Sequence, residues 1–378
     1  MLLEEISVDG FRNLQGVRLR PHPRLSVFVG DNGQGKTNLL EAIHLATALR
    51  PLRAVERAAD LVGFGAERGL IRARFLLDGP ADLEVVVEPR GRRATLNGKA
   101  VRDVASWADR VGVVSFTPDD AAFIRGGPSE RRRGLDRFAF GLWPSFAAVA
   151  RRFEDSLERR NKVLKSPLVD EQLLASYTPP FVEAAVDLVR VRARACAAWA
   201  PVFAREAVAI GGEQLAAEIS YSCGFLDEGD TVEHHDDESL RRILDARLAA
   251  ARSGELRRRA TAIGPQLDDV LVDKAGKKAR FLASQGEARS LVLALKLAAV
   301  RLMTEVRGTG PMLLLDDVAG ELDPGRAARL LGAVDDTRAQ AFVTTTHEGA
   351  LPPFGEGAVW TVSAGRVVGE VRRAAGSA

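Results

Sequence analysis

The sequence is poor in the features that mark several classes of protein. It has only two cysteines, Cys196 and Cys223, so it predicts neither a disulfide framework nor a cysteine-ligated metal site. Its most apolar stretch, residues 291–303, contains two charged residues and is too short to cross a bilayer. The net charge of +2 is far from the strongly basic balance that would by itself indicate nucleic-acid binding. The opening residues 1–5 have no basic segment before an apolar core, so we expect no signal or transit peptide, no membrane association and a cytoplasmic location.

The composition is otherwise that of an ordinary globular protein. Hydrophobic residues make up 46% of the 378 positions and charged residues 28%, and the length allows two or three domains. Alternation of apolar and polar residues predicts strands within the first 29 residues and between 70 and 101. The stretch from 129 to 256 has helical periods instead, with an expected break at Pro179-Pro180 and a polar loop over 227–238.

The pattern predicts an α/β fold whose two halves are separated in the sequence. After about residue 264 we expect a helix over 287–306, strands over 312–315 and 341–345, and a hairpin that pairs 358–362 with 367–371. One discontinuous domain, residues 1–118 and 260–378, would thus be interrupted by a mostly helical lobe, residues 119–259. The sequence shows no internal repeat and no heptad run long enough for a long coiled coil.

A glycine-rich segment between a predicted strand and a predicted helix fits the phosphate-loop pattern G-x-x-x-x-G-K-[ST]. It reads Gly30-Asp31-Asn32-Gly33-Gln34-Gly35-Lys36-Thr37. Glycines let backbone N–H groups converge on a phosphate, Lys36 is expected to neutralise the β- and γ-phosphate oxygens, and Thr37 is expected to bind Mg²⁺. The alternative is a plain glycine turn that caps a helix. The nucleotide-binding residues expected here are Gly30, Asn32, Gly33, Gly35, Lys36, Thr37 and Asn38.

Two carboxylates follow the apolar run 312–315, which is typical of a fully buried strand. Ligands of open α/β sheets bind beyond the carboxyl ends of strands. Asp316 is therefore placed to hold Mg²⁺, and Asp317 to orient or deprotonate the attacking water. The alternative is a carboxylate that caps a helix N-terminus.

The segment Ala283-Ser284-Gln285-Gly286-Glu287 precedes an amphipathic helix. Ser284 and Glu287 have the spacing of a capping box, which stabilises a helix start by about 1 kcal/mol. A small helix start with free N–H groups is also an anion site that the chain's own phosphate loop does not need. A second anion site of this kind suggests a second subunit.

Together these motifs resemble the ATP-binding-cassette ATPases of the SMC type, and most closely the RecF family of bacterial DNA replication and repair proteins. The shared marks extend from residue 11 to residue 347, so the resemblance covers nearly the whole chain. They are Phe11-Arg12-Asn13, Phe116-Thr117-Pro118-Asp119-Asp120, Gly126 to Arg133, Arg160-Asn161, Gly264-Pro265 with Asp268-Asp269, Ala283 to Gly286, Leu315-Asp316-Asp317, Gly320-Glu321-Leu322-Asp323 and His347.

The resemblance implies a cassette ATPase head in which two copies sandwich ATP and Mg²⁺. Ser284, Gln285 and Gly286 would contact the γ-phosphate held by the other copy. Arg12 would touch the phosphates, Asp323 would lie in the loop after the acidic strand, and His347 would sense the γ-phosphate. The plainer interpretations are a surface arginine for Arg12 and a loop histidine for His347. No secure glutamine marks the usual Mg²⁺-sensing loop, although Thr117 lies near its place.

The function that the resemblance implies is an ATP-driven switch on DNA. An ATP-dependent homodimer would clamp double-stranded DNA, or junctions of single and double strands, and support recombinase loading with RecO and RecR. Asp317 is one methylene shorter than the usual Glu, so we expect slow, DNA-stimulated hydrolysis. The basic runs 130–133 and 257–259 are candidate DNA contacts or solvated helix faces. The alternatives are a P-loop small-molecule kinase with the helical lobe as a lid, and a nucleotide-binding scaffold without turnover.

Overall fold

The computed structural model describes residues 1–53, 55–317, 324–337, 339–347, 349 and 354–373. Its contacts divide the chain into two compact units. Unit 1 comprises Met1–Ala121, Glu206–Leu215 and Ser284–Ala378, and unit 2 comprises Ala122–Arg205 and Ala216–Ala283. Residues 260–283, which the sequence pattern joins to the α/β domain, lie in unit 2, because a strand within them pairs with a strand of that unit.

Unit 1 contains an antiparallel sheet with the strand order β2-β1-β4-β5-β6-β7. Its strands are β1 (Leu2–Asp9), β2 (Val17–Leu19), β4 (Gly69–Leu76), β5 (Pro80–Glu88), β6 (Gly91–Leu96) and β7 (Lys99–Ala100). The predicted alternation is confirmed, since β4 buries every second residue. The turn at Asn97-Gly98 has positive φ at both residues, as a tight hairpin requires.

The second sheet of unit 1 is mostly parallel and has the order β15-β14-β3-β13-β12-β8. Its strands are β3 (Leu25–Val29), β8 (Val113–Phe116), β12 (Met312–Leu315), β13 (Ala341–Thr345), β14 (Gly357–Ser363) and β15 (Arg366–Arg373). Strand β3 lies within the first 29 residues, where strands are predicted, and the predicted strands 312–315 and 341–345 and the final hairpin are confirmed. β12 and β13 are buried along their whole length, as central parallel strands covered on both faces should be.

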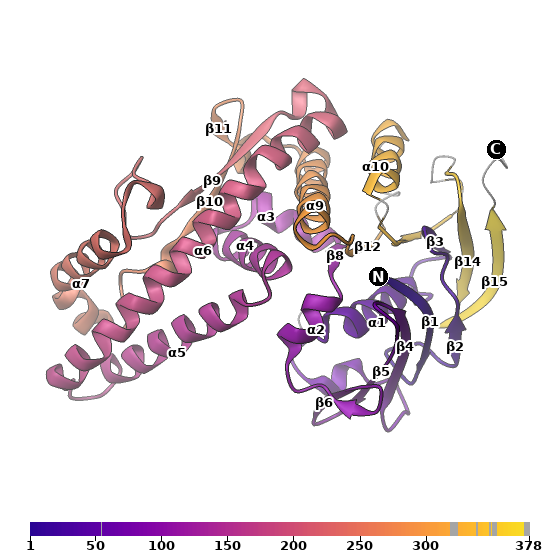
Figure 1. Ribbon diagram of the computed structural model, residues 1–378, viewed down its shortest axis with the longest axis horizontal. Helices are drawn as coiled ribbons and strands as arrows, with labels where there is room; N and C mark the ends of the chain where they lie inside the picture. The colour runs from indigo at the N-terminus through magenta and orange to yellow at the C-terminus, as the bar shows by residue number, and fades with distance from the viewer. Residues whose placement is uncertain (54, 318–323, 338, 348, 350–353, 374–378) are drawn as a thin grey trace. The chain divides into compact units, whose positions relative to one another are not determined.

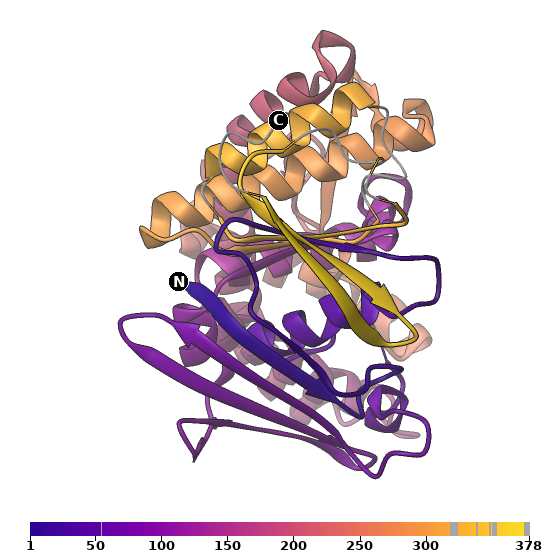
Figure 2. The ribbon, with the colours of Figure 1, turned by 90° about the vertical axis from the view of Figure 1, so that its right-hand side faces the viewer.

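Helices cover both faces of this second sheet. Helix α1 (Lys36–Ala48) buries its apolar residues in the core that it shares with both sheets. Helices α9 (Gln285–Arg307) and α10 (Pro324–Thr337) pack against each other on the opposite face (Figure 1). Figure 2 shows the same layers from the side, with α9 and α10 on one side of the sheet and the antiparallel sheet on the other. The remaining short elements of unit 1 are η1 (Ala58–Leu61), α2 (Val104–Arg110), η2 (Pro118–Ala121) and η3 (Glu213–Leu215).

Unit 2 is mostly helical, as predicted for the middle of the chain. Its helices are α3 (Ala122–Arg125), α4 (Pro128–Leu142), α5 (Phe146–Leu164), most of α6 (Glu171–Gly211), η4 (Val232–His234), α7 (Asp237–Arg258), η5 (Pro265–Leu267) and α8 (Ala279–Leu282). A small sheet of β9 (Ala217–Ser222), β10 (Asp269–Lys274) and β11 (Lys277–Lys278) completes it. Strand β9 lies inside the stretch that the sequence pattern predicts to be helical.

The expected break at Pro179-Pro180 is wrong, because α6 continues through both prolines. Both residues are exposed. The carbonyl groups that lose their helical N–H partners one turn earlier can therefore bond to water, which removes much of the cost of a proline in a helix. The apolar face that begins at Phe181 is buried and holds the helix together across this point.

Buried ion pairs tie the elements of unit 2 together. Arg131 on α4 is 4% exposed and donates two hydrogen bonds to Asp269, at 2.7 and 2.9 Å. Arg132 donates to the backbone carbonyl of Asp268. Of the basic run 130–133, Arg131 is thus a structural residue, whereas the run 257–259 at the end of α7 is exposed.

Across the described ranges, no helix is both long and apolar enough to cross a membrane, and no long coiled coil is present. The α/β fold with a mostly helical second part is the one expected from the sequence.

Candidate nucleotide-binding site

The glycine loop joins β3 to α1 and adopts a conformation that its glycines make possible. A Cβ on Gly30 would lie 2.2 Å from the carbonyl oxygen of Val362, and Gly35 has φ +109°. Gly35 is also the N-cap of α1 and provides no side-chain hydrogen bond. The first N–H groups of α1 are therefore left for another acceptor, which is the arrangement that binds phosphate.

Lys36 is a buried cation held by neutral groups. It is 7% exposed, and its Nζ donates to the carbonyl oxygens of Gly30 at 2.6 Å and Asp31 at 2.8 Å. A buried ammonium group is costly unless it is paired. An anion bound in the loop would supply the countercharge, so the position of Lys36 fits the predicted phosphate site.

Residues far away in the sequence hold the loop in place. Asn13 donates to the carbonyl of Gly33 at 3.3 Å and accepts a hydrogen bond from Asn38 at 2.8 Å. On the other side, the turn of the β14–β15 hairpin donates to Gln34: the N–H of Ala364 to Oε1 at 2.7 Å, and the N–H of Gly365 to the carbonyl at 2.9 Å. No sequence motif predicted that Asn13, Gln34 and this turn would support the loop.

Asp316, at the carboxyl end of β12, is 2% exposed and has three side-chain donors. Its Oδ1 accepts hydrogen bonds from Thr37 Oγ1 at 2.8 Å and Thr344 Oγ1 at 2.9 Å, and its Oδ2 forms an ion pair with Arg53 Nη2 at 3.0 Å. Thr37 and Asp316, the two residues predicted to bind Mg²⁺, are thus in direct contact. A hydroxyl and a carboxylate are the hard oxygen ligands that Mg²⁺ prefers, so these residues fit that ion.

Arg53 and Thr344 were not among the residues that sequence motifs predicted for this site. Thr344 could have been found, because it lies near the end of β13, and parallel register places the ends of β12 and β13 side by side. Arg53 lies outside any helix or strand, in a stretch without periodicity, so no sequence pattern pointed to it.

Asp317 is held in an unusual backbone conformation with φ +52°. Its N–H donates to Thr344 Oγ1 at 2.8 Å. Within the described part of the chain, its Oδ1 is buried and has no hydrogen-bond partner. Burial and the neighbouring Asp316 raise the pKa of Asp317, while Lys36 opposes the shift. The result is a carboxylate with unused acceptor capacity beside the phosphate loop.

The capping box predicted at the start of α9 is confirmed. Ser284 Oγ accepts from the N–H of Glu287 at 3.2 Å, and Glu287 Oε2 accepts from the N–H of Ser284 at 2.9 Å. Ser284 and Gln285 are exposed and Gly286 is half-buried. The structure gives no hydrogen bond, among the residues it describes, between this helix start and the phosphate loop of the same chain.

The other predicted residues take different positions. Arg12 connects two segments of unit 1. Its guanidinium donates to both carboxylate oxygens of Glu41, at 2.9 and 3.2 Å, and to the carbonyl of Asp60 at 2.8 Å. His347 is exposed just after β13. The hydroxyl of Thr117 is hydrogen-bonded to Asp120. Asn32 is exposed in the loop. The segment Gly320-Glu321-Leu322-Asp323 lies outside the described residues.

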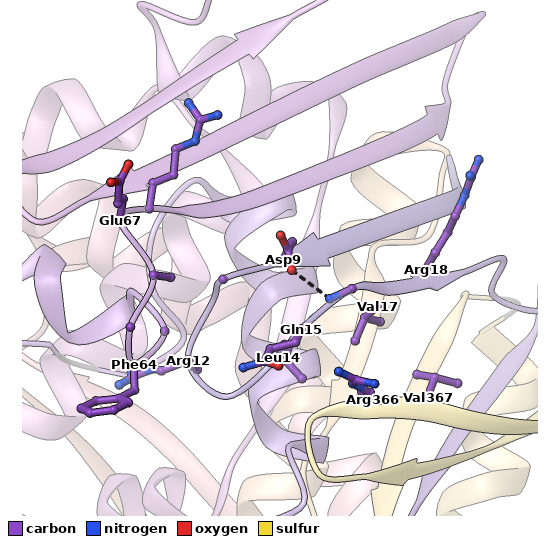
Figure 3. Close-up of a pocket in the computed structure, with 16 residues that line it drawn as sticks. Asp9, Arg12, Leu14, Gln15, Val17, Arg18, Phe64, Glu67, Arg366 and Val367 are labelled. Carbon is purple, nitrogen blue, oxygen red and sulfur yellow. Dashed lines mark hydrogen bonds between the residues drawn. The ribbon is translucent and has the colours of Figure 1, made fainter.

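A hollow of about 840 Å³ opens beside the turn that carries Asn13 (Figure 3). Arg12, Leu14, Phe64 and Arg366 line it, and Phe64 is fully exposed. The hydrogen bond from the N–H of Gly16 to Asp9, drawn in Figure 3, fixes one wall of the hollow. The carboxylates of Asp9 and Glu67 also line the hollow, so its wall carries charges of both signs beside apolar groups.

The split α/β unit, its phosphate loop and the aspartate that meets Thr37 define the class of the chain: it is a P-loop ATPase head of the type found in SMC proteins. Comparison with known proteins gives the particular family. The family model for the RecF/RecN/SMC N terminal domain matches residues 2–356. The chain belongs to the RecF family.

Two RecF proteins are similar to this chain over more than nine-tenths of its length. The DNA replication and repair protein RecF of Anaeromyxobacter dehalogenans is 40% identical over 361 residues, which cover 93% of this chain and 94% of that protein. RecF of Myxococcus xanthus is 38% identical over 354 residues, with 93% and 92% covered.

Solved structures agree. The recombination mediator protein RecF with ATP, in the RecFOR pathway, matches with a TM-score of 0.87 and 27% identity, covering 98% of this chain and 97% of that one. An SMC head bound to the C-winged helix domain of ScpA matches with a TM-score of 0.56 and 17% identity, which shows the shared fold alone.

Proposed function

We propose that this protein is an ATP-driven DNA-binding switch of replication and recombinational repair. ATP binding joins two copies into a homodimer that clamps duplex DNA, and hydrolysis separates them. The main support for the proposal is that one chain supplies the phosphate-loop half of the site but not the signature-helix half. Lys36, Thr37 and Asp316 are assembled in one chain, whereas the capped helix start at Ser284 is exposed and, among the described residues, makes no hydrogen bond to that chain's own phosphate loop.

The proposed roles follow from the contacts. Lys36 leaves the carbonyls of Gly30 and Asp31 to pair with phosphate oxygens, and Thr37 and Asp316 hold Mg²⁺. Bound Mg²⁺ would neutralise phosphate charge. Asp317 accepts the proton of the attacking water through its Oδ1, which has no partner among the described residues, and His347 contacts the γ-phosphate. Ser284, Gln285 and Gly286 of the other copy close the site. Arg12, whose guanidinium is paired with Glu41, lies next to Asn13, which is hydrogen-bonded to the loop, and would reach the phosphates from there.

Hydrolysis is proposed to be slow and stimulated by DNA. Asp317 is short, and its N–H is tied to Thr344, so the carboxylate has little freedom to approach the water. A slow step suits a switch, because the closed state must outlast the encounter with DNA. Only ATP presents the γ-phosphate that the Ser284 helix of the second copy can bind, and this difference supplies the free energy for closing.

The DNA role is supported by the relatives, which are named as DNA replication and repair proteins, and by the ATP-bound RecF structure, which is named for the RecFOR pathway. We therefore propose that the protein binds double-stranded DNA or junctions with single strands, acts with RecO and RecR, supports recombinase loading and works in the cytoplasm. Contacts are expected mainly with phosphates, so affinity should fall steeply with salt.

The test is an ATP titration in which mass is followed by light scattering and DNA binding by fluorescence anisotropy. Wild-type protein should double in mass and bind duplex DNA with ATP but not with ADP. Ser284→Arg should bind ATP as a monomer, because the bulky cation blocks the contact with the second copy.

The matched control is Ser284→Ala, which removes the cap at a cost of about 1 kcal/mol and also the hydroxyl that meets the γ-phosphate, but adds no bulk, so it should weaken dimerisation much less than Ser284→Arg. Equal masses with ATP and ADP, or a Ser284→Arg protein that dimerises normally, would contradict the proposal. ATPase activity stimulated by a small metabolite rather than by DNA would favour a kinase.

A further inference from the structure

The negative charge of Asp316 is neutralised by Arg53, which belongs to neither the phosphate loop nor a neighbouring strand. The two threonines on Oδ1 are neutral, so they satisfy lone pairs but not charge. The guanidinium of Arg53 is 3.0 Å from Oδ2 and supplies the positive charge. The carboxylate itself is 3% exposed, and a buried carboxylate without a cation is strongly unfavourable.

Arg53 is held much less firmly than the carboxylate that it neutralises. Its side chain is 42% exposed. Arg53 follows the last turn of α1 in an irregular segment. Within the part of the chain that the structure describes, its side chain makes one hydrogen bond, the one in the ion pair with Asp316. The guanidinium can therefore leave for water without breaking a helix, a strand or a second contact.

A divalent cation at Thr37 and Asp316 would compete with this arginine. Two cations on one carboxylate repel each other, and the shared carboxylate is buried, where screening is weak. Either Arg53 or the metal neutralises Asp316, but binding both costs electrostatic free energy. The phosphates of a nucleotide would add oxygen ligands and negative charge, which shifts the balance toward the metal.

We propose that Arg53 occupies the place of the divalent cation at Asp316, so that it keeps free metal out of the site and is displaced when the metal arrives with a nucleotide. This role rests on the proposed function, because it requires that Thr37 and Asp316 bind Mg²⁺. Arg53 is a positioning residue: it sets how tightly the site binds metal before ATP is present.

The experiment measures binding of Mn²⁺ alone, without nucleotide, by electron paramagnetic resonance. Arg53→Gln should bind Mn²⁺ about tenfold more tightly than wild type, because the competing charge is gone. Arg53→Lys keeps the charge and should stay close to wild type. The matched control is Arg57→Gln in the same segment, where Arg57 pairs with Asp60 at the surface, and its Mn²⁺ affinity should not change.

A second measurement uses stability. In chelator, Arg53→Gln should melt below wild type, because Asp316 has lost its countercharge, and Mg²⁺ alone should restore most of the difference. Unchanged Mn²⁺ affinity in Arg53→Gln, or a variant that fails to fold even with Mg²⁺, would overturn the proposal. Wild-type protein is titrated with Mg²⁺ and ATP in parallel: no binding there would refute the proposed function, whereas normal binding with unchanged Arg53→Gln affinity would refute only the role of Arg53.

Discussion

Asp317 combines features that cost stability at one residue. Its φ of +52° is unfavourable for a residue with a Cβ, and its Oδ1 is buried without a partner among the described residues. Its pKa is raised, first by burial and then by Asp316. Groups of this kind persist at functional sites, where surrounding structure holds them. These properties support the proposed role of Asp317 as a proton acceptor.

The raised pKa gives a prediction with a definite sign. A group whose pKa is raised on folding stabilises the folded state below its ordinary pKa, and this contribution is lost as pH rises through the folded-state value. At neutral pH the ionised Asp317 is therefore unfavourable. Asp317→Asn should raise the melting temperature at pH 7.5 by on the order of 1 °C while lowering phosphate release at least a hundredfold and sparing ATP binding.

The same shift predicts the acidic limb of the activity. In wild type, phosphate release should fall with decreasing pH at a higher pH than an ordinary aspartate would give. Asp316→Asn does not serve as a control, since Asp316 belongs to the proposed metal site. Asp335→Asn, at an exposed position on α10, should leave both the melting temperature and the rate unchanged. Full turnover in Asp317→Asn would contradict the assignment.

At the scale of elements, the phosphate loop is held from two sides, by the turn around Asn13 and by the β14–β15 hairpin. Gly365 is where these two supports meet. A Cβ at Gly365 would lie 1.9 Å from the carbonyl oxygen of Asn13, and its φ is +74°. Any side chain there must push the hairpin turn away from Gln34, and thereby loosen the loop.

Gly365→Ala should therefore lower ATP affinity about tenfold and destabilise the protein by more than the 1–2 kcal/mol that the left-handed backbone alone costs. The matched control is Gly276→Ala, at φ +73° with no atom within 4 Å of the added Cβ. It carries the same backbone strain without the collision, so it should lose stability but keep ATP affinity. Fluorescent-nucleotide titration and thermal melting of both variants make the comparison; wild-type ATP affinity in Gly365→Ala would show that the hairpin does not support the loop.

At the scale of the whole molecule, the two units have separate means of stabilisation. Unit 1 has a large apolar core shared by its two sheets and α1. Unit 2 adds buried ion pairs, among which Arg160 on α5 and Glu255 on α7 are 2% and 0% exposed. Arg160 donates to both carboxylate oxygens of Glu255, at 2.9 and 2.7 Å, and to Thr261 at 2.8 Å. The Arg160-Asn161 motif is thus explained by packing within unit 2.

Removing one partner of this pair should have a large effect. Arg160→Ala leaves Glu255 buried and uncompensated, which costs about 3–5 kcal/mol. Arg159→Ala, at the exposed neighbour, should cost less than about 0.5 kcal/mol. Urea unfolding followed by circular dichroism measures both. Because Arg160 lies in unit 2 and the phosphate loop in unit 1, ATP affinity of the folded variant should match wild type. Equal urea midpoints for Arg160→Ala and wild type would contradict the role of the pair.

The sequence by itself determined the features that depend on short stretches of chain. The glycine loop, the capping box at Ser284 and the buried strand before Asp316 each need only four to eight neighbouring residues, whose conformational preferences and spacing act locally. The two parallel strands and the helix after the loop were predictable for the same reason.

The distant residues that complete the site could be identified only once the strands were seen packed together. Asn13, Thr344 and the hairpin turn at Gly365 reach the loop or Asp316 across separations of 20 to 330 residues, and Arg53 reaches Asp316 across 263. No local preference encodes such contacts, because they form when the sheet brings strand ends together. The prolines of α6 show the converse, because a local rule predicted a break where the helix continues. Both prolines face water, and burial of the apolar face beyond them stabilises the helix by more than the lost hydrogen bonds cost.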